Sequence, residues 1–384
     1  MYTIALPLRE RPAPATAGVL PLIWDPWNYW DGFGRCGAVG MPRQSKMVPE
    51  SRRSTLTPLV TIVVVERERF ATTERSLESL YAHTRSPFEL IYMDAGSPRR
   101  VKGYLAAAAK RYGFRHWRMS HYMPPHTARK LGAAAATTPY VVFVDNDVLF
   151  SDGWLDALVD CAEDSGADIV APLVCIGEPA HTVVHVAGGI ATTYEEEGRR
   201  YFREVQRFQG NLLKDVRDRL VREPTGLFEF HCVLIRRSLF DRVGPLDTAY
   251  LSSSEHLDLC LAVRGINGAI FFEPGSIVTY LSPPPLALSD VLYYTLRWSD
   301  DWTLASEQHF HRKWELEFDD RVVRFVVEHR RHGLRKIRRA ILGLVGWRRS
   351  RRFSDWLDAA LASIARRRCW PRPGEATAPQ ADEK

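Results

Sequence analysis

The 384-residue sequence lacks long hydrophobic runs, because no stretch of 18 consecutive apolar residues occurs in it. A helix needs about 20 such residues to cross a bilayer, so we predict no membrane-spanning helix. The sequence also does not start with a charged segment followed by an apolar stretch, so we expect no secretory signal peptide. These absences favour a cytoplasmic location.

Cysteine is scarce, with six residues in the chain and no Cys-x-x-Cys spacing. Several of the cysteines lie inside apolar segments, which favours buried free thiols in a reducing compartment over zinc ligands or disulfides. Internal repeats are absent as well. The composition, with 45% hydrophobic and 26% charged residues, is that of a folded protein with a core.

Positive charge is concentrated near the end of the chain. Residues 321–372 contain 16 Arg or Lys and three acids, although the net charge of the whole chain is only +6. Basic clusters alternate there with apolar turns, which is typical of a helix lying on an anionic membrane; a solvated helical hairpin explains the pattern equally well. No nucleic-acid-binding motif accompanies the charge, so we expect no nucleic-acid partner.

The order of the patterned segments predicts the fold class. Residues 1–57 are rich in Pro, Gly and Arg without periodicity and predict an irregular N-terminal arm. Buried strands and helices then alternate as strand, helix, strand, helix, helix, strand, over the ranges 59–65, 72–84, 88–93, 99–113, 128–138 and 140–144. This order predicts an α/β fold with a doubly wound, mostly parallel sheet.

The second half has a different pattern. A charged excursion over 193–223 separates two predicted strands or strand-to-helix joints. A helix and a strand pair follow, and residues 286–370 are mostly helical. They include an aromatic-rich part in which Trp298, Trp302 and Trp314 are expected to pack as anchors. The predicted strands are 168–176 and 231–240, the helix is 255–268 and the strand pair is 269–280.

Acidic residues follow three of the predicted parallel strands. Glu66 comes after the first, Asp94 after the second, and Asp145 and Asp147 after the third. Ligands of open parallel sheets bind beyond the carboxyl ends of the strands, and alternate residues point the same way. Asp145 and Asp147 could therefore share Mg²⁺ or Mn²⁺; the alternative is a solvated turn or a helix cap.

The phosphate-cradling glycine motif of dinucleotide-binding folds is missing after the first strand. The residues there are "ERERFATT" and not G-x-G-x-x-G, which argues against a dehydrogenase or a similar nucleotide enzyme.

From residue 59 to 281 the sequence resembles the family 2 glycosyltransferases, which have the nucleotide-sugar-binding GT-A fold. Five landmarks in the order of that family carry the resemblance: "TIVVVERERFATTERSLESLYAHT", "FELIYMDAGS", "ARKLGAAAATTPYVVFVDNDV", "HCVLIRRSLFDRVGPLD" and "EHLDLCLAVRGINGAIFFEPGSIV".

The resemblance implies roles on the donor side. Asp145 and Asp147 match the D-x-D motif that holds a divalent ion against the donor diphosphate, with Asp147 the more direct ligand. Asp94 matches the acid beside the nucleoside, and Arg129 matches the basic residue near the pyrophosphate. Glu66 is expected either to contact the ribose or base, or to be a surface acid paired with Arg67 or Arg69.

The acceptor side is implied by "SSSEHLDLCL", where relatives commonly have Glu-Asp and the second acid is the base. Here the pair is Glu255-His256, and either residue is a candidate base, because an imidazole titrates near neutral pH. His231 is a candidate acceptor contact or metal ligand. Ala95, Lys130 and Tyr280 depart from the family pattern, so an inactive nucleotide-sugar-binding protein is the alternative function.

The resemblance implies an inverting, metal-dependent transfer of a sugar to an acceptor hydroxyl, in bacterial glycan, glycolipid or glycoconjugate assembly. Expected partners are a UDP-, GDP- or dTDP-linked donor, a glycan, lipid-linked or small-molecule acceptor, and an anionic membrane surface at the inner face of the plasma membrane. The predicted division is an arm (1–57), a catalytic domain (58–285) with a nucleotide-sugar half (58–150) and an acceptor half (151–285), an aromatic helical segment (286–320) and a basic helical tail (321–384).

Overall fold

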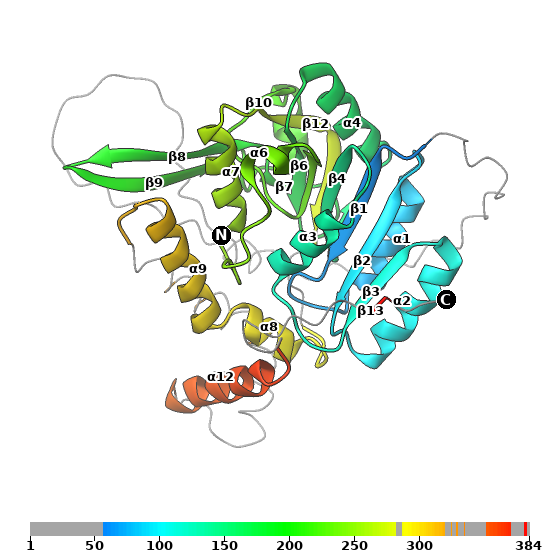
Figure 1. Ribbon diagram of the computed structural model, residues 1–384, viewed down its shortest axis with the longest axis vertical. Helices are drawn as coiled ribbons and strands as arrows, with labels where there is room; N and C mark the ends of the chain where they lie inside the picture. The colour runs from blue at the N-terminus through cyan, green and yellow to red at the C-terminus, as the bar shows by residue number, and fades with distance from the viewer. Residues whose placement is uncertain are drawn as a thin grey trace.

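In a computed structural model of the protein, the chain forms a central sheet covered by helices on both faces (Figure 1). The structure describes residues 57–281, 286–318 and 351–369, together with residues 324, 328, 334, 380 and 381. The predicted N-terminal arm and most of the predicted basic tail therefore lie outside the described residues, and the predicted division into domains stays a prediction.

The central sheet is mostly parallel, as the sequence predicts. Its strand order is β10-β12-β6-β11-β4-β1-β2-β3-β13, with β5 paired to β12 and β7 to β6. Strand β1 is parallel to β2 and β4, β2 to β3, and β12 to β6, whereas β11 is antiparallel to both of its neighbours. The strands are β1 (Val60–Val65), β2 (Glu89–Ala95), β3 (Arg115–Met119), β4 (Tyr140–Asp145), β5 (Val148–Phe150), β6 (Ile169–Ile176), β7 (Val183–Val186), β10 (Glu223–Pro224), β11 (Cys232–Arg236), β12 (Ile270–Tyr280) and β13 (Gln380–Ala381).

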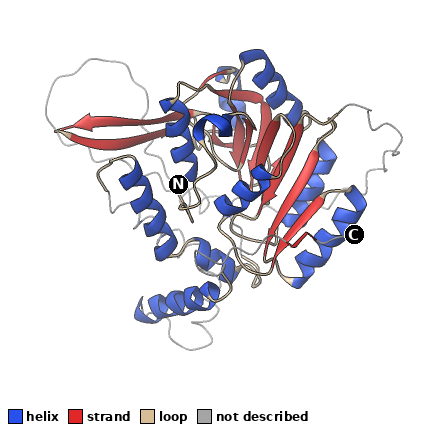
Figure 2. Ribbon diagram, viewed as in Figure 1, coloured by secondary structure: helices blue, strands red, loops and turns tan. Residues whose placement is uncertain are grey.

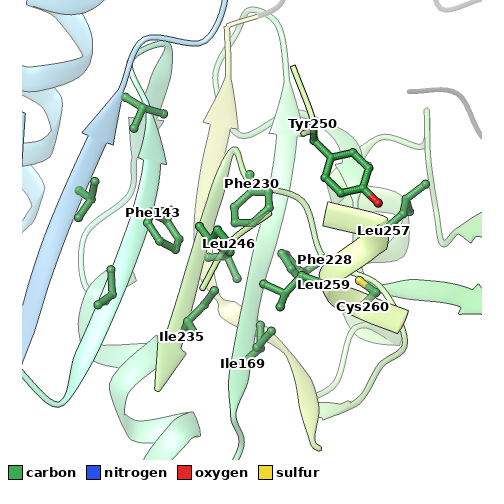
Figure 3. Packing of buried hydrophobic residues seen from close by; sticks show 14 of the residues in the cluster. Phe143, Ile169, Phe228, Phe230, Ile235, Leu246, Tyr250, Leu257, Leu259 and Cys260 are labelled. Atoms are coloured by element: carbon green, nitrogen blue, oxygen red, sulfur yellow. The ribbon is translucent and has the colours of Figure 1, made fainter. Parts of the chain in front are cut away.

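Both faces of the sheet are apolar because the buried strands have apolar side chains on each side. Along β1, Val63 and Val65 pack into one core, while Ile62 and Val64 pack into the other. Helices α3 (Pro125–Ala134), α6 (Leu239–Val243) and α7 (Glu255–Gly265) contribute to the first core, and α1 (Thr73–His83), α2 (Arg99–Tyr112) and α4 (Trp154–Ser165) to the second (Figure 2). Figure 3 shows the first core, where Phe143, Phe230 and Ile235 lie over one face of the sheet, in the same cluster as Leu259 and Cys260 of α7.

Helix α3 lies unusually close to β1, and Gly132 makes this approach possible. A Cβ atom at Gly132 would lie 2.3 Å from Cγ1 of Val63. Glycine therefore lets the helix that carries Arg129 pack directly onto the strand that leads to Glu66, which brings both residues to the same edge of the sheet.

Several elements differ from the expectation, including the following three. Strand β3 was not predicted, because only its last residue, Met119, is buried and its sequence has no apolar pattern. The predicted charged excursion contains a hairpin of β8 (Gly189–Glu196) and β9 (Arg199–Gln206), whose turn at Glu197 and Gly198 has left-handed backbone conformation. The predicted strand pair at 269–280 is one strand, β12, with a register shift between Glu273 and Ile277.

The C-terminal helices cover the edge of the sheet at which the parallel strand β1 ends. Helix α8 (Val291–Arg297) places Tyr293 against Phe70 and Tyr122, with ring centroids 5.0 and 5.2 Å apart. Helix α9 (Asp300–Lys313) follows it, and α12 (Arg351–Arg366) packs on α8. Among the described residues, no helix is long and apolar enough to cross a membrane.

Candidate active site

The carboxyl ends of β1, β2 and β4 bring three buried acids to one edge of the sheet. Asp94 and Asp145 lie in the last two residues of β2 and β4, and Glu66 directly follows β1. The register places Val65 beside both Met93 and Asp145. All three acids are buried at this edge, where the sequence predicts a ligand site.

Asp94 is fully engaged within the protein. Its Oδ1 accepts a hydrogen bond from the backbone N–H of Ser97 at 2.8 Å, and its Oδ2 accepts from His116 at 3.2 Å and from Arg118. Burial alone would raise the pKa of Asp94, but the hydrogen bond from His116 and the charge of Arg118 lower it below its usual value. Asp94 thus stabilises the turn after β2, and its contact with a donor nucleoside stays a prediction.

Glu66 joins the ends of β1 and β2. Its Oε2 accepts a hydrogen bond from the backbone N–H of Ala95 at 2.7 Å, and its Oε1 has no hydrogen-bond partner. Burial, assisted by the nearby negative charge of Asp94, raises the pKa of Glu66 well above its usual value. The expectation of a surface acid paired with Arg67 or Arg69 is wrong, because Glu66 is completely buried.

Asp145 is held in place by an arginine of the opposite helix. Arg129, on α3, donates a hydrogen bond from Nη2 to Oδ1 of Asp145 at 2.6 Å. The other oxygen, Oδ2, has no hydrogen bond, but it lies 3.4 Å from Nε of Arg67 and 3.3 Å from Nδ1 of His231. One oxygen of the carboxylate is therefore fixed, while the other faces several polar groups.

Asp147 is buried without a hydrogen bond to either of its carboxylate oxygens. Its nearest cation is Arg69, whose Nη2 lies 3.7 Å from Oδ2. Burial raises the pKa of Asp147 to about 7, because the charge of Arg69 only partly offsets it and Asp145 adds repulsion. A buried carboxylate in this state needs a further positive charge to be stable as an anion.

The middle residue of the motif, Asn146, connects it to the segment after β1. Its Nδ2 donates to the backbone oxygen of Arg69 at 2.7 Å and to Oγ1 of Thr73 at 3.0 Å. Its Oδ1 accepts from the backbone N–H of Arg67 at 3.2 Å. Asn146 therefore sets the distance between the two aspartates and the two arginines.

A buried cluster of Asp145, Asp147 and His231 has the chemistry of a divalent cation site. One ligand atom from each residue lies within 4.8 Å of those of the other two. The atoms without hydrogen bonds are Nδ1 of His231, Oδ2 of Asp145 and both carboxylate oxygens of Asp147. Burial keeps the pKa of His231 well below its usual value, so its imidazole is neutral and able to coordinate. Two carboxylates and an imidazole fit Mn²⁺ or Mg²⁺.

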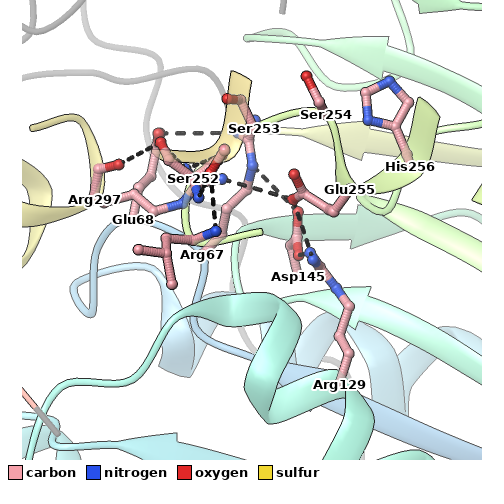
Figure 4. Close-up of polar contacts among 12 residues, drawn as sticks. Arg67, Glu68, Arg129, Asp145, Ser252, Ser253, Ser254, Glu255, His256 and Arg297 are labelled. Carbon is pink, nitrogen blue, oxygen red and sulfur yellow. Dashed lines mark hydrogen bonds and ion pairs between the residues drawn. The ribbon is translucent and has the colours of Figure 1, made fainter. Parts of the chain in front are cut away.

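Glu255, the first residue of α7, points toward the same centre (Figure 4). Its Oε1 lies 3.4 Å from Nη1 of Arg129 and 3.8 Å from Nη2 of Arg297. Burial would raise the pKa of Glu255, but Arg297 and Arg129 outweigh it and lower the pKa to about 2. Glu255 is therefore an anion that fixes two arginines.

His256 is turned away from Asp145 and Arg129 (Figure 4) and faces the β8–β9 hairpin. Its Nε2 has no hydrogen bond and lies 3.6 Å from Oε1 of Glu229, in a cluster that also includes Glu204. Burial lowers the pKa of His256 to about 4, against the opposing charge of Glu204. The histidine is buried and is therefore neutral at physiological pH.

A small cavity connects the two groups of residues. Its volume is about 40 Å³, which is far below the roughly 300–1,000 Å³ of a typical ligand pocket. A large ligand therefore requires this site to open. The cavity is lined by Arg67, Arg129, Asp145, Glu229, Phe230, His231, Ser252, Ser253, Glu255, His256, Arg297, Trp298 and Glu307.

Several residues of the site were not predicted. Arg297 and Trp298 come from the end of α8, and Glu229 precedes β11, so only folding brings them to the sheet edge. From the sequence, Arg67 and Arg69 are expected only as partners of Glu66. Their sequence "RER" lies just after a buried strand, and a position after a buried strand is also the pattern that identified the two aspartates.

Known proteins are similar to the part of the chain that forms the sheet and this site. The sequence model described as "Glycosyl transferase family 2" matches residues 61–244. A protein called "Uncharacterized protein y4gI" from Sinorhizobium fredii is 26% identical over 223 residues, which is 54% of this chain and 23% of that protein. A "Pre-mycofactocin glycosyltransferase" from Mycobacterium tuberculosis is 26% identical over 223 residues, which is 58% of this chain and 42% of that protein.

The match spans less than half the length of these curated relatives. Among solved structures, the crystal structure of GalNAc-T7 with UDP, GalNAc and Mn²⁺ aligns with a TM-score of 0.47 and 15% identity. The alignment covers 76% of this chain and 58% of that chain.

Proposed function

From the match of residues 61–244 to the glycosyl transferase family 2, we propose that this chain belongs to that family and transfers a sugar from a nucleotide-sugar donor to an acceptor hydroxyl with inversion. The observation that carries this proposal is the buried Asp145–Asp147–His231 cluster, of which Asp145 and His231 line the same cavity as Glu255 and His256. It combines a cation site with a candidate base, as a single-displacement transfer requires.

On the donor side, we assign Asp145, Asp147 and His231 as the residues that would hold Mg²⁺ or Mn²⁺. Such an ion, when bound, supplies positive charge that stabilises a departing nucleoside diphosphate. Arg129 adds a fixed positive charge beside Asp145, because its hydrogen bond of 2.6 Å and its ion pair with Glu255 prevent it from moving. Electrostatic stabilisation of this preorganised kind needs no covalent intermediate.

On the acceptor side, we propose His256 as the base. Glu255 is the weaker candidate, because two arginines lower its pKa to about 2 and occupy its carboxylate. The imidazole of His256 is neutral and has a free Nε2, and Glu229 and Glu204 lie beside it, where they would stabilise the imidazolium after proton transfer. Glycan, lipid-linked and small-molecule acceptors all fit this chemistry.

An inactive nucleotide-sugar-binding protein is the second candidate function. Ala95, Lys130 and Tyr280, which depart from the family pattern, favour it. The cavity volume of about 40 Å³ does not separate the two functions, because a donor has to enter the site in both.

The deciding experiment measures the release of nucleoside diphosphate from UDP-, GDP- and dTDP-sugars with Mn²⁺ or Mg²⁺, alongside thermal shifts with the same compounds. We expect one class of nucleotide-sugar both to raise the melting temperature and to be turned over, and chelation of the metal to stop turnover. Stabilisation without turnover would favour the inactive protein, and the absence of both would exclude either function.

We also propose that α12 contacts an anionic membrane surface as a peripheral element. Trp356 and Ile364 are 61% and 49% exposed, whereas Ala365 is buried in the apolar cluster of Phe70 and Tyr293. One side of α12 thus packs on the protein and another presents apolar side chains to the surroundings. Arg367 and Arg368 follow directly and are exposed, which is the combination expected at an anionic interface.

Substituting Trp356→Asp and Ile364→Asp together is expected to abolish co-sedimentation with phosphatidylglycerol vesicles, because it places negative charge on the apolar contact. Deleting α12 is a poorer test, since Ala365 belongs to a buried cluster. The matched control is Val221→Asp, at a residue that is 53% exposed near β10. Unchanged sedimentation of the double variant would rule out α12 as the contact.

A further inference from the structure

The segment directly after β1 inserts two arginines into the candidate cation site. Arg67 and Arg69 lie in "ERERF", between β1 and α1, outside regular secondary structure. Arg67 approaches Asp145 and Arg69 approaches Asp147, so each aspartate of the motif has its own arginine. The two guanidinium groups therefore lie next to the aspartate oxygens that would coordinate a cation.

The contacts of both arginines are loose. Nε of Arg67 lies 3.4 Å from Asp145 and Nη1 lies 3.9 Å from Glu68, both beyond the usual hydrogen-bond distance. Its guanidinium carbon lies 4.9 Å from the ring centre of Tyr280 and 5.9 Å from that of Trp298. Arg69 is 2% exposed, yet its Nε and Nη2 have no hydrogen-bond acceptor.

Arg129 provides the contrast within the same site. Its Nη2 donates to Asp145 at 2.6 Å, and Glu255 lies at 3.4 Å, so this arginine is fixed by two carboxylates. Arg67 has no contact this short, and its side chain is 14% exposed. Its guanidinium is therefore the one that can change partners without breaking a strong hydrogen bond.

The site contains two complementary sets of unsatisfied buried atoms. Unsatisfied acceptors on Asp145, Asp147 and His231 require a cation, whereas unsatisfied N–H donors on Arg67 and Arg69 require an anion. A divalent cation alone would compete with the arginines for the aspartates. A cation that arrives with a diphosphate would satisfy both sets, because the phosphate oxygens accept from guanidinium groups.

We propose that Arg67 and Arg69 are diphosphate-binding residues that pair with Asp145 and Asp147 until a donor binds. In the donor complex the aspartates face the cation and the arginines face the diphosphate. This exchange rests on the proposed glycosyltransferase function. It also accounts for the small cavity, since the volume that the donor phosphates would occupy is filled by Arg67 against Tyr280 and Trp298.

Arg67→Gln is the decisive variant, because it removes the charge and keeps much of the side-chain length. We expect isothermal titration to show tighter binding of MnCl₂ alone, because a competing cation is gone. Binding of UDP, GDP or dTDP in the presence of Mn²⁺ should weaken at least about tenfold, the effect of one lost hydrogen bond to a charged group. Opposite changes in the two affinities are specific to the proposed exchange.

Two further variants keep the result interpretable. Arg67→Lys retains the charge without the planar guanidinium, so it should bind Mn²⁺ alone as the wild type does and bind the nucleoside diphosphate more weakly. Arg75→Gln, on α1, is the matched control, because Arg75 is exposed and pairs with Glu178 at the surface. It should change neither affinity.

If Arg67→Gln and Arg67→Lys bind the nucleoside diphosphate as tightly as the wild type, or if Arg67→Gln weakens Mn²⁺ binding, the proposed exchange is wrong while the glycosyltransferase function still holds. If the wild type itself binds none of the nucleoside diphosphates, both proposals are overturned. Melting temperatures without ligand show whether each variant is folded.

Discussion

Replacing Asp147 by alanine is expected to reduce sugar transfer by roughly a thousandfold and to eliminate binding of Mn²⁺. A catalytic cation contributes several kcal/mol to a transition state, and about 1.4 kcal/mol corresponds to a factor of ten in rate. Asp147 is the member of the cluster whose two oxygens both lack hydrogen bonds, so it has the most coordination capacity to lose. Product release measures the rate, and the electron paramagnetic resonance of free Mn²⁺ measures binding.

The lack of hydrogen bonds to the Asp147 carboxylate makes the Asp147→Ala variant easy to interpret. Since the carboxylate has no hydrogen bond and burial raises its pKa, its removal should lower the melting temperature of the free protein only slightly, through the loss of the 3.7 Å ion pair with Arg69. Asp152→Ala is the matched control, because Asp152 lies a few residues further along and is exposed, paired with His83. Full activity of Asp147→Ala in the presence of a chelator would exclude the proposed cation site.

Replacing His256 by alanine is expected to lower kcat by about 10²- to 10⁴-fold, the usual contribution of a general base, without weakening donor binding. His256 is separated from Asp145 and Arg129, so its loss should leave the donor side intact (Figure 4). Glu255→Gln should show the opposite pattern. It would release Arg129 and Arg297, and therefore weaken donor binding more than it lowers kcat.

The pH dependence of kcat/KM gives a second test of the base. Burial lowers the pKa of His256 to about 4, so the neutral, proton-accepting form is present above that pH and is lost as the pH falls through it. At saturating Mn²⁺, which keeps Asp147 ionised, the rate should therefore show no falling limb from His256 between about pH 6 and 8, where a histidine with an unperturbed pKa near 6.5 would give one. A nearly inactive Glu255→Gln with an active His256→Ala would assign the base to Glu255.

The strand ends are the part of the site that could be read from the sequence. Asp145 and Asp147 follow a buried β-branched run, and the carboxyl ends of parallel strands meet at one edge, so their location follows from local pattern alone. The same rule applied to "RER" after β1 would have identified Arg67 and Arg69. Charged residues after a strand are most often solvated, however, and only the structure shows that Arg69 is buried.

Elements with weak local patterns were missed for a common reason. Strand β3 is polar except for Met119, and the β8–β9 hairpin has charged residues on its exposed faces. Neither pattern separates a strand from a loop. The hairpin matters for the site, since it carries Glu204 to the vicinity of His256.

By itself, the sequence determined the α/β class, the mostly parallel sheet and the edge of the sheet at which the acids lie. These features follow from the order of the apolar segments and from the residues at which strands end, and both are local properties of the sequence. Only the tertiary structure decided which charges meet. Arg129 and Glu255 are 126 residues apart, and Arg67 and Trp298 lie in distant parts of the sequence, yet both pairs line one cavity. The groups that surround each side chain determine which carboxylate is held by arginines, which imidazole stays neutral and which guanidinium can change partners. Such properties depend on distance and burial, which a linear pattern does not encode.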